Sequence, residues 1–271
     1  MGFKTFILNE GRSKSITMDD ARQMYLANCK QYKWEEQLVY RGIESINMET
    51  AWFTDPSKSE RKSRNTSNFY TLWIDNSKKW STYPKRSKSL ICSTSLSTAS
   101  EFGDGDSFMV IPFDGAKIGV CPSYDMWDCF YNELTKLSLY TLPEFNMYIW
   151  NAISTITQHL NVSKDEMTKD IKTLKKWLTD ADKIISKQPR EAKKRLSDGG
   201  WDDDVFESII RFGNLTKIMD MVLDPQTNGF KVMPFKNFEH ASFPNKEVWT
   251  DSPCILIPDT ADAIEQFDEW I

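Results

Sequence analysis

The chain has 271 residues, of which 40% are hydrophobic and 13% aromatic, and its formal net charge is −5. This length allows one large domain or two small ones, at roughly 100–200 residues per domain, and the aromatic content excludes a disordered chain. The acidic balance argues against electrostatic binding of nucleic acid by the whole molecule, although a local basic face is compatible with it.

The five cysteines are scattered, without the close spacing of a zinc site or the even count of a disulfide framework. We therefore expect no metal. The N-terminal residues lack the apolar run of a signal peptide, and no stretch reaches the ~18–20 apolar residues of a membrane span. These features predict a soluble, cytoplasmic protein with no membrane among its partners.

The first predicted element is an amphipathic helix within residues 17–33. Thr17 and Asp20 form a capping-box-like start, and apolar residues then recur on one helical face. A short strand follows within 37–43, where an apolar run stops at a charged residue and a glycine. Residues 55–68 are polar and rich in turn formers, which indicates a loop.

A buried strand is predicted over 89–95, ending in three hydroxyl residues, and a short helix closed by Gly103 comes next. Two apolar runs, 108–113 and 116–120, are separated by Asp114-Gly115. Because a DG dipeptide between apolar runs is a strong turn signal, these runs predict a β-hairpin.

Between about 130 and 222 the pattern becomes helical. Apolar residues recur at three- and four-residue steps over 171–185, and a second amphipathic helix is predicted over 201–222. Residues 163–198 carry 11 Lys or Arg against 7 Asp or Glu, so the basic side of these helices is a candidate surface for a partner.

Strand-like segments return at 230–235, 247–250 and 254–258. Strands thus flank a central helical block, which favours an α+β fold over alternating βαβ units. We predict one domain over residues 1–271, with a helical insertion at about 130–222.

Three segments far apart in the chain hold the candidate functional residues. They are Tyr-Arg-Gly at 40–42, Ser-Thr-Ser at 93–95 and Asn-Lys-Glu at 245–247, each at the end or start of a predicted strand. Their order and flanks resemble the ADP-ribosyltransferases whose signature is an arginine on an early strand, a Ser-Thr-Ser strand that leads into a short helix, and a late glutamate. The likeness spans residues 37–120 and 230–258.

The resemblance implies an ADP-ribosyltransferase-like split antiparallel β-sandwich with flanking helices and the helical block inserted. It also implies an enzyme that binds NAD⁺ as a substrate between two sheets, without a metal. ADP-ribose would pass from NAD⁺ to a macromolecular acceptor, and nicotinamide would be released.

The residue types suit this reaction. Cleavage of the bond to nicotinamide develops positive charge on the ribose, which a fixed carboxylate at Glu247 would stabilise. A guanidinium at Arg41 matches the oxygens of the pyrophosphate. Ser93 would hydrogen-bond Glu247 or the ribose and keep the carboxylate oriented. The resemblance further implies that the Gly42 main chain holds the nicotinamide amide, with support for the cleft from Thr94 and Ser95.

The acceptor is expected to differ from arginine. Relatives that modify arginine have glutamate two residues before the catalytic glutamate, whereas this chain has Asn245, which cannot take a proton from a guanidinium. Phe235 and Phe238 lie in the segment where the family reads its target, and either ring is a candidate to stack on a nucleobase or to contact a protein. Nucleic acid and protein both remain candidate acceptors.

Such enzymes act as toxins, anti-phage effectors or phage-encoded modifiers of the host, which implies the cytoplasm of a bacterial host cell as the location. An antitoxin or inhibitor protein is a further partner to expect. Two other functions stay open: an NAD⁺ glycohydrolase, in which water is the acceptor, and a non-catalytic interaction protein on the same fold.

Several residues outside the three segments admit a chemical interpretation. Asp125 and Asp128 invite a pair of catalytic carboxylates, but more simply start a helix. A nucleophilic Cys–His pair, such as Cys254 with His240, is a further alternative, but no nucleophile motif surrounds either residue. The basic segment 83–88 reads as a solvated loop, with contact to phosphate or nucleic acid as the alternative.

Overall fold

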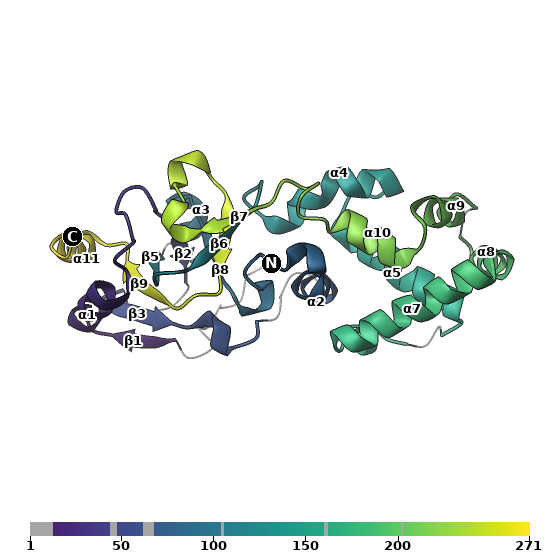
Figure 1. The fold of residues 1–271 in the computed structure, drawn as a ribbon, viewed down its shortest axis with the longest axis horizontal. Coiled ribbons are helices and arrows are strands. Elements are labelled where there is room, and N and C mark those ends of the chain that lie inside the picture. Colours follow the sequence, from purple (N-terminus) through teal and green to yellow (C-terminus); the bar gives the residue numbers. More distant parts are fainter. Residues whose placement is uncertain (1–12, 44–47, 62–67, 104–105, 160–161, 202) are drawn as a thin grey trace. The chain divides into compact units, whose positions relative to one another are not determined.

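The structure is a computed structural model that describes residues 13–43, 48–61, 68–103, 106–159, 162–201 and 203–271. The chain divides into two compact units, which Figure 1 shows in sequence colours. The sheet unit comprises Met1–Lys62, Thr82–Met126 and Gly229–Ile271, and the helical unit comprises Ser63–Ser81 and Trp127–Asn228. The helical insertion expected at about 130–222 makes up most of the helical unit.

The sheet unit contains one nine-stranded sheet in the order β1-β3-β9-β5-β2-β4-β8-β6-β7, and all its paired neighbours are antiparallel. The strands are β1 (Lys14–Ile16), β2 (Tyr40–Gly42), β3 (Ala51–Thr54), β4 (Leu90–Ser93), β5 (Ser107–Pro112), β6 (Lys117–Val120), β7 (Lys231–Pro234), β8 (Glu247–Thr250) and β9 (Cys254–Pro258). A mixed fold around a large antiparallel sheet agrees with the α+β prediction.

Two halves of this sheet meet at its middle. Along the described backbone, β2 and β4 share a single residue pair, Tyr40 with Ser93, whereas β2 pairs with β5 at three positions and β4 with β8 at four. The half β1-β3-β9-β5-β2 is therefore joined to the half β4-β8-β6-β7 by a narrow link.

The predicted hairpin between β5 and β6 is wrong. β5 pairs with β2 and β9, and β6 pairs with β7 and β8, so the two strands belong to different halves of the sheet. Gly115 does adopt the left-handed φ of +85° that a turn needs. The Asp114 carboxylate, however, accepts hydrogen bonds from the N–H groups of Lys30 and Gln31, so the turn is tied to the segment after the first helix.

Three helices cover the sheet: α1 (Met18–Asn28), α3 (Leu96–Phe102) and α11 (Ala261–Asp268). α1 and α11 pack against each other and against β9, while α3 packs against β2. α1 begins as predicted, because the Thr17 side chain accepts from the N–H of Asp20 (3.0 Å). Short 3₁₀ turns occur at Pro56–Lys58, Lys78–Trp80, Arg86–Lys88, Met126–Phe130, Thr135–Leu137, Phe235–Asn237 and His240–Ser242.

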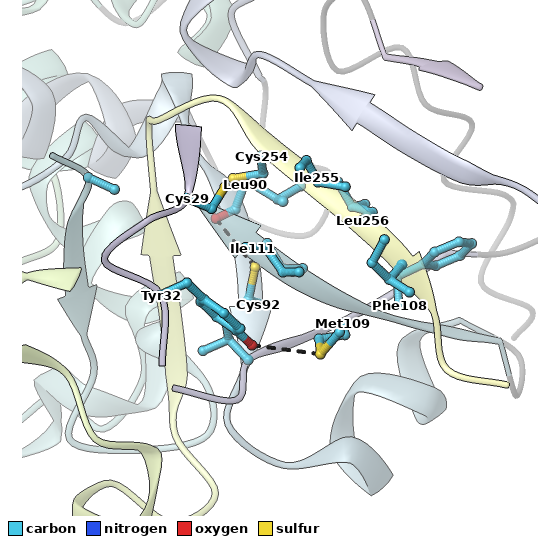
Figure 2. Close-up of a cluster of buried hydrophobic side chains, with 14 of the residues drawn as sticks. Cys29, Tyr32, Leu90, Cys92, Phe108, Met109, Ile111, Cys254, Ile255 and Leu256 are labelled. Atoms are coloured by element: carbon cyan, nitrogen blue, oxygen red, sulfur yellow. Dashed lines mark hydrogen bonds between the residues drawn. The ribbon is translucent and has the colours of Figure 1, made fainter. Parts of the chain in front are cut away.

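The core of the sheet unit lies where β5 and β9 pair beneath α1 and α11. Figure 2 shows side chains of this cluster, among them Phe108, Ile111 and Leu256, all fully buried. Tyr32 points into the same cluster, and its hydroxyl contacts the Met109 sulfur at 3.7 Å. Burial of this apolar surface is the main source of the unit's stability.

The helical unit contains α2 (Asn68–Asn76), α4 (Tyr131–Leu134), α5 (Leu142–Thr157), α6 (Lys164–Met167), α7 (Ile171–Lys187), α8 (Pro189–Asp198), α9 (Asp203–Phe212) and α10 (Leu215–Val222). The single helix predicted over 201–222 is two helices. Gly213, with φ at +105°, ends α9, and Asn214 then caps α10 by accepting from the N–H of Lys217 (2.8 Å).

Two glycines let α3 lie directly on β2. A Cβ atom added to Gly42 would lie 1.9 Å from the carbonyl oxygen of Ala99 and 2.6 Å from the nitrogen of Gly103. A Cβ on Gly103 would in turn lie 2.8 Å from the Cα of Gly42. The Tyr-Arg-Gly and Ala…Gly patterns therefore have a packing cause, since two backbones touch there.

We expect Gly42→Ala to destabilise the sheet unit by about 3 kcal/mol, because the added methyl group meets backbone atoms that cannot yield. Gly115→Ala is the matched control. Its site is open, so only its left-handed backbone opposes the substitution, at a cost of about 1 kcal/mol. Urea unfolding measures both changes, and equal costs would contradict this packing account.

Candidate active site

The ladder between β4 and β8 brings two of the three predicted segments together. Ser93 pairs with Glu247, and Tyr40 pairs with Ser93 on the other side of β4. Residues directly opposite each other in antiparallel strands project from the same face of the sheet. Ser93 and Glu247 are therefore neighbours on one face, at the place where the two halves of the sheet meet.

Arg41 lies on β2, the next strand, but one residue beyond Tyr40. Because side chains alternate along a strand, Arg41 leaves the sheet on the face opposite to Ser93 and Glu247. Its Nη1 donates to the carbonyl oxygen of Ile91 on β4 at 2.7 Å. The structure thus places Arg41 at the narrow link between the halves, with its side chain turned towards β4.

The Ser-Thr-Ser hydroxyls organise the passage from β4 into α3. The Ser93 hydroxyl accepts from the N–H of Ser95 (3.0 Å), and the Ser95 hydroxyl caps α3 by accepting from the N–H of Thr98 (3.3 Å). The Thr94 hydroxyl donates to the carbonyl of Phe243 (2.6 Å). Each hydroxyl therefore has a local structural use, whether or not it also contacts a ligand.

Hydrogen bonds between Lys246 and Thr94 hold the turn before Glu247 against the end of β4. The N–H of Lys246 donates to the Thr94 hydroxyl (2.8 Å), and the N–H of Thr94 donates to the carbonyl of Lys246 (3.0 Å). Asn245 is exposed and adopts a left-handed φ of +49°, a conformation that asparagine tolerates. Its Oδ1 accepts from the Thr98 hydroxyl (2.8 Å), so α3 sets its orientation.

The carboxylate of Glu247 is paired with an arginine that the sequence did not indicate. Arg86 Nη2 lies 2.5 Å from Glu247 Oε1, and the two side chains are 5% and 13% exposed. Glu247 Oε2 accepts from the N–H of Met126 (3.3 Å), and the Cys121 sulfur lies 3.7 Å from Oε1. Glu247 is therefore a partly buried carboxylate held by a guanidinium and a main-chain donor.

Arg86 is enclosed by aromatic residues and by its own loop. Its guanidinium lies over the Trp249 ring at 5.4 Å, a cation–π geometry. The Trp249 indole donates to the carbonyl of Pro84 (2.9 Å) and stacks on Tyr83, and Gly119 leaves space for the ring. The expectation of a solvated basic loop over 83–88 is therefore wrong for Arg86, which is 4% exposed.

The two phenylalanines predicted to read the acceptor are core residues. Phe235 is 5% exposed and Phe238 is fully buried, with the two rings stacked at 5.7 Å and Phe238 stacked on Phe243 at 5.6 Å. That part of the prediction is wrong, because the rings fill the core between strands. Tyr124, 52% exposed, lies in the segment that bonds to Glu247 through the carbonyl of Ser123 (3.0 Å).

The alternative nucleophile pair does not form. Cys254 is fully buried, and burial raises the pKa of its thiol well above the usual range. The Nδ1 of His240 instead lies 3.0 Å from the carbonyl of Glu36. Asp125 precedes the 3₁₀ turn Met126–Phe130, which contains Asp128, as the helix-start interpretation required.

Comparison with protein-family models, with curated proteins and with solved structures finds no match for this chain. Within the described ranges, no group of three or more His, Cys, Asp or Glu side chains is arranged to hold a metal ion. In the same part of the chain, none of the helices combines the length and apolar character that crossing a bilayer requires.

Loss of one partner of the Arg86–Glu247 pair should be costly. We expect Arg86→Met and Glu247→Gln each to destabilise the sheet unit by about 3–5 kcal/mol, since each leaves a buried polar partner uncompensated. The double variant should cost less than the sum of the two single variants. If the destabilisation of the double variant equals the sum of the two single destabilisations within about 0.5 kcal/mol, the two residues are not coupled. The exposed Lys33–Glu36 pair serves as control and should change stability far less.

Cysteine alkylation tests the description of the thiols. Burial raises the pKa of Cys29 to about 12, and Cys92, Cys121 and Cys254 are buried as well, whereas Cys129 is partly exposed. We expect iodoacetamide at pH 8 to modify Cys129 first in the native protein and all five cysteines in urea. Rapid native labelling of Cys254 would restore the nucleophile interpretation.

Proposed function

We propose that this protein is a mono-ADP-ribosyltransferase that cleaves NAD⁺ and transfers ADP-ribose to a macromolecular acceptor. The observation that carries the proposal is the register at the middle of the sheet. Three segments chosen from sequence alone, far apart in the chain, lie on the adjacent strands β2, β4 and β8, and Ser93 stands opposite Glu247. In an ADP-ribosyltransferase-like split β-sandwich, this is the place where NAD⁺ would bind.

Glu247 would act as the carboxylate that stabilises the developing charge on the ribose. Arg86 holds its Oε1 and the N–H of Met126 holds its Oε2, so the group is oriented before a substrate arrives. Such preorganised groups stabilise a transition state without reorganising during the reaction. The partial neutralisation by Arg86 opposes this effect, so the carboxylate must act through its remaining lone pairs.

Ser93 would bind the ribose on the face of the sheet that it shares with Glu247, whereas Arg41, which leaves the opposite face, would hold β2 against β4 through the carbonyl of Ile91. The Ser93 hydroxyl lies on the same face as Glu247, where a ribose hydroxyl would meet both. In this proposal Gly42, Thr94 and Ser95 shape the site, and the hydrogen bonds of the two hydroxyls keep β4, α3 and the turn at Asn245 in register.

The acceptor would meet the exposed edge of this site. Thr98 occupies Oδ1 of Asn245, so the amide NH₂ is the group that would donate to an acceptor. With Phe235 and Phe238 buried, Tyr124 is the exposed ring in the segment that flanks Glu247. A donor and an aromatic ring suit a neutral acceptor group, such as a base or an amide, better than a guanidinium.

The enzymatic test is release of nicotinamide from NAD⁺ labelled in its ADP-ribose part, with bacterial lysate as the source of acceptor. We expect Glu247→Gln to slow release by about 10²–10³-fold, because a preorganised charge is lost. Glu265→Gln, at an exposed position on α11, is the matched control and should leave the rate unchanged. Absence of NAD⁺ cleavage by the wild-type protein, or full activity of Glu247→Gln, would refute the proposal.

Folding must be measured in the same variants, because Glu247 also partners Arg86. Activity is therefore compared at a temperature where circular dichroism shows both proteins folded. Digestion of the labelled products with nuclease or protease then separates nucleic-acid from protein acceptors. Label found only in free ADP-ribose would indicate an NAD⁺ glycohydrolase instead.

A further inference from the structure

Outside the candidate active site, a row of exposed lysines lies on one helix of the helical unit. Helix α7 buries Leu174, Leu178, Ala181 and Ile185 on one side. Four lysines, Lys172, Lys176, Lys183 and Lys187, occupy the opposite side, and all are exposed. At 3.6 residues per turn these four fall within an arc of about 60° and span about 22 Å along the axis.

This lysine ridge continues into the turn between α7 and α8. A hollow of about 320 Å³ beside the ridge is lined by Lys183, Lys187, Gln188 and His159. A second, shallower depression shares Lys187 and Gln188 and adds Arg190 and Arg195. The two depressions are therefore contiguous, and cations line the whole path.

The acids along this path are already balanced. Asp180, which lines the hollow, pairs with Lys176 at 3.1 Å, and Glu191 pairs with Arg195 at 2.9 Å. Exposed ion pairs of this kind contribute little to stability and are screened by salt. Lys183, Lys187 and Arg190 then give the path a surplus of positive charge over the described residues of α7 and α8.

An aromatic pair stands at one end of the path. His159 is exposed, and its ring meets that of Trp177 edge to face at 5.1 Å. Lys176 lies over the same Trp177 ring at 5.3 Å. A row of cations beside an exposed ring is the arrangement by which proteins follow a phosphate backbone and contact bases.

We propose that the ridge and its two depressions bind nucleic acid through the phosphodiester backbone, and that this nucleic acid is the acceptor of the reaction. The second half of this statement rests on the proposed function, whereas the binding itself does not. A strand of nucleic acid carries a charge about every 3.4 Å, so the ridge of about 22 Å would face some six phosphates. Amide and imidazole groups at Gln188 and His159 would add contacts to bases or sugars.

The test is fluorescence anisotropy with short labelled RNA, DNA of the same sequence, and the DNA duplex, at about 50 to 200 mM salt. The full chain should bind at least one probe, with log affinity falling linearly against log salt. The variant Lys172→Gln/Lys176→Gln/Lys183→Gln/Lys187→Gln should bind more weakly. Its salt slope should fall by about 3, at 0.7–0.9 per phosphate contact.

The matched control removes the same number of exposed lysines from the sheet unit, as Lys14→Gln/Lys30→Gln/Lys58→Gln/Lys117→Gln. It should bind with the slope of the wild-type protein. Binding of no probe at about 50 mM salt, equal loss in both variants, or equally tight binding of polyglutamate would overturn the proposal. The last outcome would identify an acidic protein surface as the partner.

Nicotinamide release, measured with bacterial lysate as the source of acceptor, separates the two proposals. Nucleic-acid binding without any NAD⁺ cleavage would leave the ridge as a binding surface and refute the transferase. Cleavage without binding would keep the enzyme and refute the ridge. If both hold, nuclease-sensitive label is expected to disappear in the ridge variant, while nicotinamide release continues with water as the acceptor and the label appears in free ADP-ribose.

Discussion

The pairing register between β4 and β8 is the constraint on which the candidate site depends. It runs from Leu90 with Thr250 to Ser93 with Glu247. A slip of one residue would turn Glu247 into the core and Val248 out of it, because side chains alternate along a strand. Burying an unpaired carboxylate costs far more than any single hydrogen bond in the sheet, so the register is strongly specified.

The end of this ladder is secured by Thr94. Its hydroxyl bonds both to the carbonyl of Phe243 and to the N–H of Lys246, which closes the turn before Glu247. Two residues further along β8, Trp249 fills the space over Gly119 of the neighbouring strand β6, and its ring contacts the Arg86 guanidinium. One ladder thereby fixes a hydroxyl, a carboxylate and a guanidinium with respect to each other.

Local signals predicted much of this fold. Thr17 caps α1, Ser95 begins a short helix, and the strands at 247–250 and 254–258 have the expected bounds, because caps and alternation act between near neighbours in the chain. Contacts between residues far apart in the chain determine the features that local signals do not predict. Asp114 turns towards the backbone after α1, so its DG turn does not close a hairpin, although the dipeptide itself is a strong hairpin signal.

In the candidate site, too, the sequence indicated some residues and not others. The order of Arg41, Ser93 and Glu247 was enough to place all three on adjacent strands. Arg86 could not be found in this way, since its loop looks like any solvated basic segment until β8 supplies Trp249 and Glu247. The prediction that Phe238 is exposed to an acceptor is wrong for a related reason. The sequence around a phenylalanine in a polar loop does not indicate whether other aromatic rings will bury it, as Phe235 and Phe243 do here.

The narrow link between Tyr40 and Ser93 also has a consequence for the motions of the sheet. Hydrogen exchange follows the free energy needed to open each part of a structure, and contiguous ladders open as units. The five residue pairs between β5 and β9 give one half a long ladder, and the four pairs between β4 and β8 give the other a shorter one. The seam beside Ser93 carries the least backbone pairing between the two halves, supported further by the Arg41 hydrogen bond to Ile91 and by the shared apolar core, so amide exchange should be fastest along it.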